Sequence, residues 1–143
     1  MKPGMVRLPR RYSLGFTLIE IVTAIVIVGI LAAMAYPSYV SQIQKSRRSD
    51  AKQALASAAQ ALERYFTEQN TYQTATLGSS GVYPSTSTNG DYALSITAQT
   101  QTTYSLQAVP GGKQAGDQCG TFTLNEQGVQ GVSGGTLTAA NCW

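Results

Sequence analysis

The feature that most constrains this chain is an apolar run over residues 16–36 that holds one acidic residue, Glu20, near its start. As a helix, its 21 residues would be roughly 31 Å long, enough to cross the hydrocarbon core of a bilayer. A carboxylate in such a helix is costly unless it has a specific partner. The run therefore predicts a membrane-length helix with a functional acidic group near one end.

Charge and residue types exclude several function classes. The formal charge of +3 is set largely by a short leader. From Phe16 onward the chain has six Lys or Arg residues and seven Asp or Glu residues. The overall charge is therefore no sign of a nucleic-acid-binding surface. Histidine, the commonest general base and metal ligand, is missing. We expect no catalysis, no metal and no cofactor.

The two cysteines, Cys119 and Cys142, lie near the C-terminal end. Two thiolates without histidine do not make a tetrahedral zinc site. The N-terminus is of an export type, which indicates an oxidising compartment and favours a disulfide. Closing that loop would stabilise a small domain by roughly 3 kcal/mol. The alternative is a pair of buried free thiols.

Composition divides the chain into four segments. They are a basic leader (1–15), an apolar helix for a membrane or filament core (16–37), an amphipathic helix (38–70), and a loop followed by strands (71–143). The basic residues of the leader are Lys2, Arg7, Arg10 and Arg11.

The amphipathic segment carries one narrow apolar stripe, spaced as one face of a helix. It consists of Ala51, Leu55, Ala58, Leu62 and Phe66. Pro37 separates this segment from the apolar run. A proline kinks a continuous helix without necessarily ending it, so we expect one long bent helix from residue 16 to about 70.

Beyond residue 71 the chain turns rich in Ser, Thr, Gly, Gln and Tyr, and residues 71–90 read as a loop. Apolar and polar residues then alternate over 92–97, 104–108 and 121–124. Alternation with one apolar face predicts antiparallel strands packed on a cover, here the helix stripe. The expected fold class is α+β, with a Gly-rich tail over 131–143 tethered through Cys142.

The N-terminus permits two ordinary interpretations. A secretory signal peptide would use Ala33-Met34-Ala35 as its small-residue cleavage site. A plain single-span anchor would explain the length of the run and leave Glu20 without a purpose. The acidic residue, the fifteen-residue leader and the smooth continuation of the helix all weigh against a signal peptide.

A third interpretation joins these features. The leader is followed by Gly15-Phe16-Thr17-Leu18-Ile19-Glu20, which resembles the processing site of type IV pilins, and Pro37 fits the same pattern. The resemblance implies that a prepilin peptidase cuts between Gly15 and Phe16 on the cytoplasmic face and N-methylates Phe16. It also implies a single-pass inner-membrane protein with a periplasmic domain, later built into a surface pilus.

Glu20 then acquires a role in assembly. After cleavage, the Phe16 amine of one subunit can meet the Glu20 carboxylate of a neighbour inside an apolar bundle. An unpaired charge is strongly penalised there, so the pair would set the axial register. Within one chain the same pair is only a contact at the start of the helix.

Three stretches of the domain resemble PilE-like minor pilins: 62–72, 119–124 and 141–143. The family fold is a long N-terminal helix on a small antiparallel sheet with a C-terminal disulfide loop. The expected function is that of a minor pilin, serving twitching motility, adhesion or DNA uptake. Its partners would be other pilin subunits and the assembly machinery.

Two alternatives to a plain pilus subunit remain. One is a pseudopilin of the type II secretion system. The other is a DNA-binding receptor pilin that uses the basic cluster Lys45, Arg47, Arg48 and Lys52. Such a cluster beside a membrane span is more often a solvated or inter-subunit face, so DNA ranks as an unlikely partner.

Overall fold

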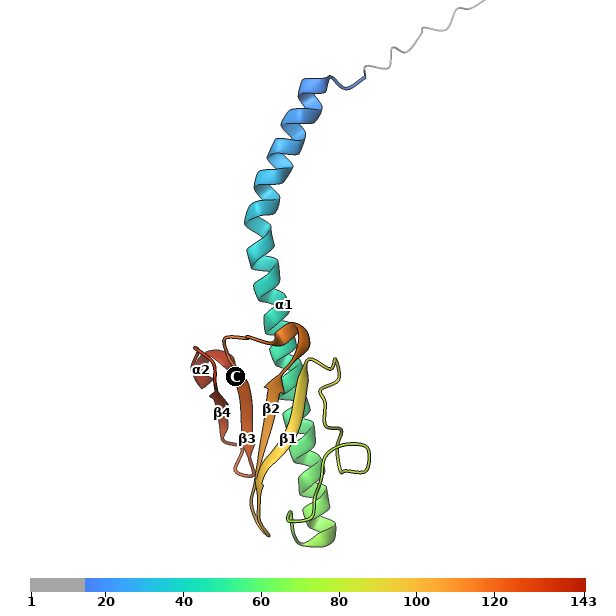
Figure 1. The fold of residues 1–143 in the computed structure, drawn as a ribbon, viewed down its shortest axis with the longest axis vertical. Coiled ribbons are helices and arrows are strands. Elements are labelled where there is room, and N and C mark those ends of the chain that lie inside the picture. The colour runs from blue at the N-terminus through green and yellow to red at the C-terminus, as the bar shows by residue number, and fades with distance from the viewer. Residues whose placement is uncertain (1–14) are drawn as a thin grey trace, which may run out of the picture. The chain divides into compact units, whose positions relative to one another are not determined.

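The computed structural model describes residues 15–143, so the predicted leader lies outside the described residues except for Gly15. Along the chain follow α1 (Leu18–Gln69), β1 (Tyr92–Gln99), β2 (Tyr104–Pro110), η1 (Gly112–Gln114), β3 (Thr121–Asn125), β4 (Gln130–Ser133) and α2 (Ala139–Cys142) (Figure 1). The chain forms two compact units that divide between Tyr39 and Val40.

Helix α1 begins and ends with recognisable caps. The hydroxyl of Thr17 accepts a hydrogen bond from the Glu20 N–H at 3.3 Å, which satisfies a donor at the open helix start. At the other end, Asn70 adopts a φ of 55°, the left-handed conformation that commonly closes a helix. Pro37 lies inside α1. The predicted long helix is confirmed.

In the N-terminal unit, the apolar side chains of α1 face outward. Leu18 is 82% exposed and Met34 is 72% exposed. Within residues 15–143, α1 is the helix that is long and apolar enough to cross a membrane. Such a surface needs lipid or other apolar helices around it.

In the unit Val40–Trp143, four antiparallel strands form one sheet in the order β1-β2-β3-β4. Leu94 pairs with Ala108, and Ala108 pairs with Phe122, so apolar side chains align on one face. The register between β1 and β2 shifts once, between Ile96 and Ala98.

The core lies between this sheet face and α1. Ala51, Leu55, Ala58 and Leu62 of the predicted stripe are fully buried, and Phe66 is partly buried. The sheet contributes the predicted inward residues, among them Tyr92, Leu94, Tyr104, Leu106, Ala108, Phe122 and Leu124. The periodicities predicted a helix packed on an antiparallel sheet, the resemblance implied the same α+β fold, and both predictions are confirmed.

The Gly-rich tail contains two regular elements. Residues Gln130–Ser133 form β4 against β3, and Ala139–Cys142 form α2. A Cβ on Gly131 would lie 2.6 Å from the Thr123 hydroxyl, so a larger residue here would have to displace that hydroxyl. The predicted disulfide Cys119–Cys142 is present and fixes the tail to the start of β3.

The segment between α1 and β1 runs along the free edge of β1. Leu94 N–H donates to the Ser85 carbonyl at 2.7 Å, and Ser87 N–H donates to the Tyr92 carbonyl at 2.9 Å. These bonds satisfy part of an edge that would otherwise present unpaired backbone groups.

A carboxylate and two tyrosines join the end of α1 to the sheet. Glu63 accepts hydrogen bonds from the hydroxyls of Tyr72 at 2.9 Å and Tyr104 at 3.2 Å. Burial, followed by the Glu63 hydrogen bond and charge, raises the pKa of Tyr72 to about 12. Burial and then the Glu63 charge likewise raise the pKa of Tyr104.

Candidate functional site

The first candidate site is the start of α1. Glu20 is exposed in the first turn, four residues after Phe16. Within residues 15–143 its carboxylate forms no ion pair and accepts no hydrogen bond. A charge among exposed apolar side chains that has no partner within residues 15–143 is suited to meet a cation from another molecule.

The second candidate is the basic cluster of α1, which the structure separates into two kinds of residue. The Arg48 guanidinium is buried and bidentate on Asp117, with its Nε 3.0 Å from each carboxylate oxygen. The Tyr92 hydroxyl also lies 3.4 Å from Asp117. The expectation of a solvated or inter-subunit face is therefore wrong for Arg48, which holds the segment before β3 against α1.

Arg47 is also engaged within the domain. Its Nε lies 3.4 Å from Asp91, and its Nη1 donates to the Lys113 carbonyl at 3.1 Å. Asp50, which precedes the apolar stripe of α1, is buried and accepts the Asn89 N–H at 3.3 Å. The two arginines in the middle of the basic cluster are therefore both bonded to other parts of the domain.

Lys45 and Lys52 remain, and they line a pocket of about 220 Å³ beside the C-terminal tail. The pocket is also lined by Arg48 and Ser49 of α1 and by Asn141, Cys142 and Trp143 at the C-terminus. We call this hollow the lysine pocket. Burial, and then the nearby positive charge of Arg48, lowers the pKa of Lys52. The pocket is therefore cationic and partly shielded from water.

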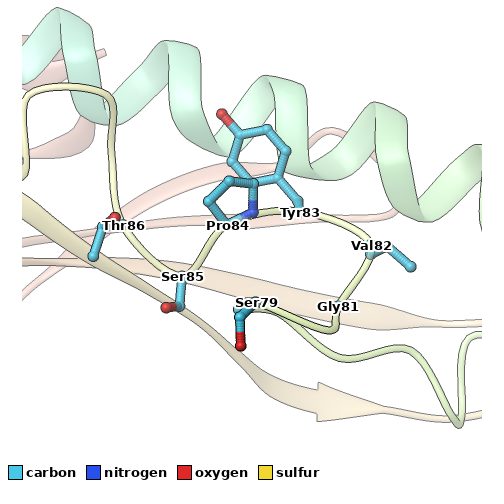
Figure 2. Close-up of a pocket in the computed structure, with 8 residues that line it drawn as sticks. Ser79, Gly81, Val82, Tyr83, Pro84, Ser85 and Thr86 are labelled. Atoms are coloured by element: carbon cyan, nitrogen blue, oxygen red, sulfur yellow. The ribbon is translucent and has the colours of Figure 1, made fainter.

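A larger and shallower hollow of about 490 Å³ lies in the loop before β1, within residues 78–86. Figure 2 shows the rings of Tyr83 and Pro84 on one side of this loop and the hydroxyls of Ser79 and Ser85 on the other. The hollow is lined by neutral residues only. It offers hydroxyl groups and two rings, and it lacks a charge that would hold an anion.

Sequence reasoning found the cations of α1 and missed their carboxylates. Asp117 lies 69 residues from Arg48 along the chain, and the sequence carries no signal for such a pairing. Over the part of the chain that the structure describes, no three His, Cys, Asp or Glu side chains gather closely enough to hold a metal ion.

Comparisons with known families match both parts of the chain. Residues 10–36 match the prokaryotic N-terminal methylation motif. Residues 37–123, more than half of the chain, match a family described as type IV minor pilin ComP, DNA uptake sequence receptor.

Among curated relatives, fimbrial protein EcpC of Eikenella corrodens is 30% identical over 86% of this chain and 71% of its own length. Type IV major pilin protein PilA of Myxococcus xanthus is 40% identical over 58 residues, so the chain spans about a quarter of that protein (26%). Type II secretion system core protein G of Pseudomonas aeruginosa is 38% identical over 48% of this chain and 49% of that protein.

Two solved structures have a similar fold. A type IV pilin from Shewanella oneidensis is 34% identical, with a TM-score of 0.51 over 70% of this chain and 97% of that one. The minor pilin PilV of Neisseria meningitidis is 24% identical, with a TM-score of 0.57 over 69% of this chain and 95% of that one. The second likeness concerns the fold alone.

Proposed function

This chain belongs to the type IV minor pilins of the ComP family, and from that membership we propose that it is a pilus subunit that binds DNA. Pilins are structural proteins, and the chain is not an enzyme. The observation that carries the proposal is the match of residues 37–123 to the DNA-uptake receptor family.

Maturation follows from the methylation motif. A prepilin peptidase cuts between Gly15 and Phe16, and the new Phe16 amine is methylated. The matched motif over residues 10–36 includes this bond. A hydrophobic N-terminal helix is typical of pilins anchored in the inner membrane before assembly. We propose a single span with the domain in the periplasm, followed by extraction into a surface pilus.

Assembly in this proposal depends on two charges. The Phe16 amine of one subunit pairs with the Glu20 carboxylate of its neighbour in the filament core. The absence of a partner for Glu20 within residues 15–143 supports this role. Because either charge alone would be buried without compensation, only one axial register satisfies both. Pro37 lies where the apolar run gives way to the domain helix.

DNA binding is supported by the family match and by the difference between the paired and the unpaired cations of α1. Arg47 and Arg48 are held by carboxylates of the domain itself, whereas Lys45 and Lys52 are not. Overall charge near balance is compatible with DNA binding if the free cations gather on one surface.

The proposal is tested by binding of the full chain, in non-ionic detergent, to a fluorescent DNA duplex. Fluorescence anisotropy should report binding whose affinity falls steeply as salt rises, because DNA contacts release counterions. If the full chain shows no measurable binding even at low salt, the receptor function is refuted and the proposal reduces to a pilus subunit.

A pseudopilin of type II secretion is the second candidate, favoured by the 38% identity to core protein G. That likeness covers 48% of the chain, whereas the minor-pilin family model covers residues 37–123, more than half of it. Deleting the gene discriminates between the two. Loss of DNA uptake or of surface filaments supports the pilin, and loss of enzyme secretion with normal filaments supports the pseudopilin.

A further inference from the structure

Of the three cations that line the lysine pocket, only Arg48 has a counterion within residues 15–143. Arg47 and Arg48 are each paired with an aspartate. Within the described range, 15–143, neither Lys45 nor Lys52 forms an ion pair. Unpaired cations that share a hollow attract an anion more strongly than scattered surface lysines do.

The two lysines share one helix face with a hydroxyl between them. Lys45, Ser49 and Lys52 are spaced by four and three residues on α1, and all three line the pocket. Seven residues of helix span about 10.5 Å. The long flexible stems of two lysines can bring both ammonium groups to one anion across that distance.

The surroundings of Lys52 favour a bound anion. Burial and the charge of Arg48 both disfavour its protonated form and lower its pKa. An anion seated in the pocket offsets both effects, because it stabilises the ammonium group directly. The site gains more from a negative ligand than an exposed lysine would.

The opposite wall of the pocket is fixed before any ligand arrives. The disulfide Cys119–Cys142 anchors the tail that carries Asn141. The Trp143 ring packs edge-to-face on Phe122 at 5.5 Å, and its Nε1 donates to the Gly131 carbonyl at 2.9 Å. Because this wall is already ordered, binding of a ligand costs less conformational entropy.

We propose that the lysine pocket binds a phosphate group of the DNA backbone, with Lys45 and Lys52 supplying charge and with Asn141 donating the amide N–H that its bond to Thr138 leaves over. This inference rests on the DNA-binding function proposed above and names the surface that performs it. Phosphate contacts fix position and strength without reading sequence. Recognition of a particular sequence belongs to other groups of the domain.

The test compares salt dependence of duplex binding between the wild type and Lys45→Gln/Lys52→Gln, using the full chain in non-ionic detergent. Loss of one phosphate contact should make the slope of log K against log salt shallower by about 0.9. Affinity at low salt should fall at least roughly tenfold. The fall should be the same for two duplexes of unrelated sequence, as a backbone contact requires.

Two further variants serve as controls. Arg64→Gln/Lys113→Gln also removes two positive charges, from exposed residues that do not line the pocket. It should keep the wild-type slope. Lys45→Arg/Lys52→Arg retains the charge and should keep most of the affinity. Thermal melting of each variant checks that the domain remains folded.

Each outcome is decisive. If the wild type fails to bind DNA, the receptor function falls and this inference falls with it. If the wild type binds and the double glutamine variant keeps its slope and affinity, the pocket assignment alone is overturned. A variant that binds DNA normally but loses binding to micelles containing phosphatidylglycerol would assign the pocket to a lipid headgroup, which also overturns the proposal.

Discussion

At the scale of single residues, Glu20 carries the assembly proposal. Glu20→Ala should leave cleavage and membrane insertion intact and reduce the subunit in sheared filaments at least tenfold. The reason is that an unpaired amine in the filament core costs about 3–5 kcal/mol. Immunoblots of the sheared and membrane fractions provide the measurement.

Thr17→Ala is the matched control for Glu20→Ala. It removes the hydroxyl that accepts the Glu20 N–H and costs the helix start about 1 kcal/mol, but it keeps the carboxylate. Incorporation should remain near the wild-type level. Normal incorporation of Glu20→Ala itself would refute the register argument.

Asp117 is predicted to be among the most sensitive positions of the domain. Asp117→Ala leaves the Arg48 guanidinium buried without a counterion, which costs about 3–5 kcal/mol. Urea unfolding of the compact unit Val40–Trp143 measures the loss. The double variant Arg48→Met/Asp117→Leu should recover most of it, and a single-variant loss below about 1 kcal/mol would place the pair among weak surface bridges.

The residues that the sequence could and could not predict differ in kind. Glu20 could be recognised because it is a charged residue inside an apolar run. The disulfide could be predicted because the chain has only two cysteines. Arg48 and Asp50 look like ordinary surface charges. Their burial depends on partners at Asp117 and Asn89 that only the fold brings near.

At the scale of elements, the link between α1 and the sheet predicts an alkaline loss of stability. The folded-state pKa of Tyr72 is about 12 against an ordinary value of 10.0, and the pKa of Tyr104 is raised too. A raised tyrosine pKa contributes stability that is complete below pH 10 and lost as pH rises through the folded value.

Denaturant unfolding of the unit Val40–Trp143 at pH 8 to 12 should show this decline. Glu63→Gln removes the charge that both hydroxyls face, so it should make the decline shallower. An equally steep decline in this variant would assign the effect to other groups.

The segment before β3 packs closely against the turn after β4. Replacing a glycine should therefore cost more stability at Gly120, which lies in this contact, than at Gly128. Gly120 has a φ of 62°, and a Cβ there would lie 2.3 Å from the Ser133 carbonyl oxygen. Gly128 has a φ of 74° and open space around it. Gly128→Ala should cost about 1–2 kcal/mol for the backbone alone, and Gly120→Ala roughly 1–3 kcal/mol more for the clash. Equal losses in chemical unfolding would contradict this close contact.

The periodicities predicted α1 and strands β1 to β3, because each carries several apolar residues at its own spacing. Strand β4 escaped prediction, since it has four residues with a single large apolar side chain, Val132. Its place is set by pairing with β3 and by the disulfide, which are tertiary constraints. Likewise, no sequence pattern predicted the hollow within residues 78–86.

At the scale of the whole molecule, the chain combines an apolar helix start with a domain that has its own core. The proposed membrane and filament roles could be inferred from residues 15–37 because processing and insertion signals are carried by the local sequence. The proposed DNA binding appeared from the sequence only as an unlikely alternative, because cations and carboxylates nearly balance. Which cations remain free depends on which are paired inside the fold.

The central claim is that this chain is a processed pilin, and the N-terminal peptide of the protein recovered from sheared surface filaments tests it most directly. Mass spectrometry should find a peptide that begins at Phe16 and carries one N-methyl group. An N-terminus at Tyr36, after Ala33-Met34-Ala35, would contradict the account, because the chain would then lack both Glu20 and the apolar helix on which assembly depends.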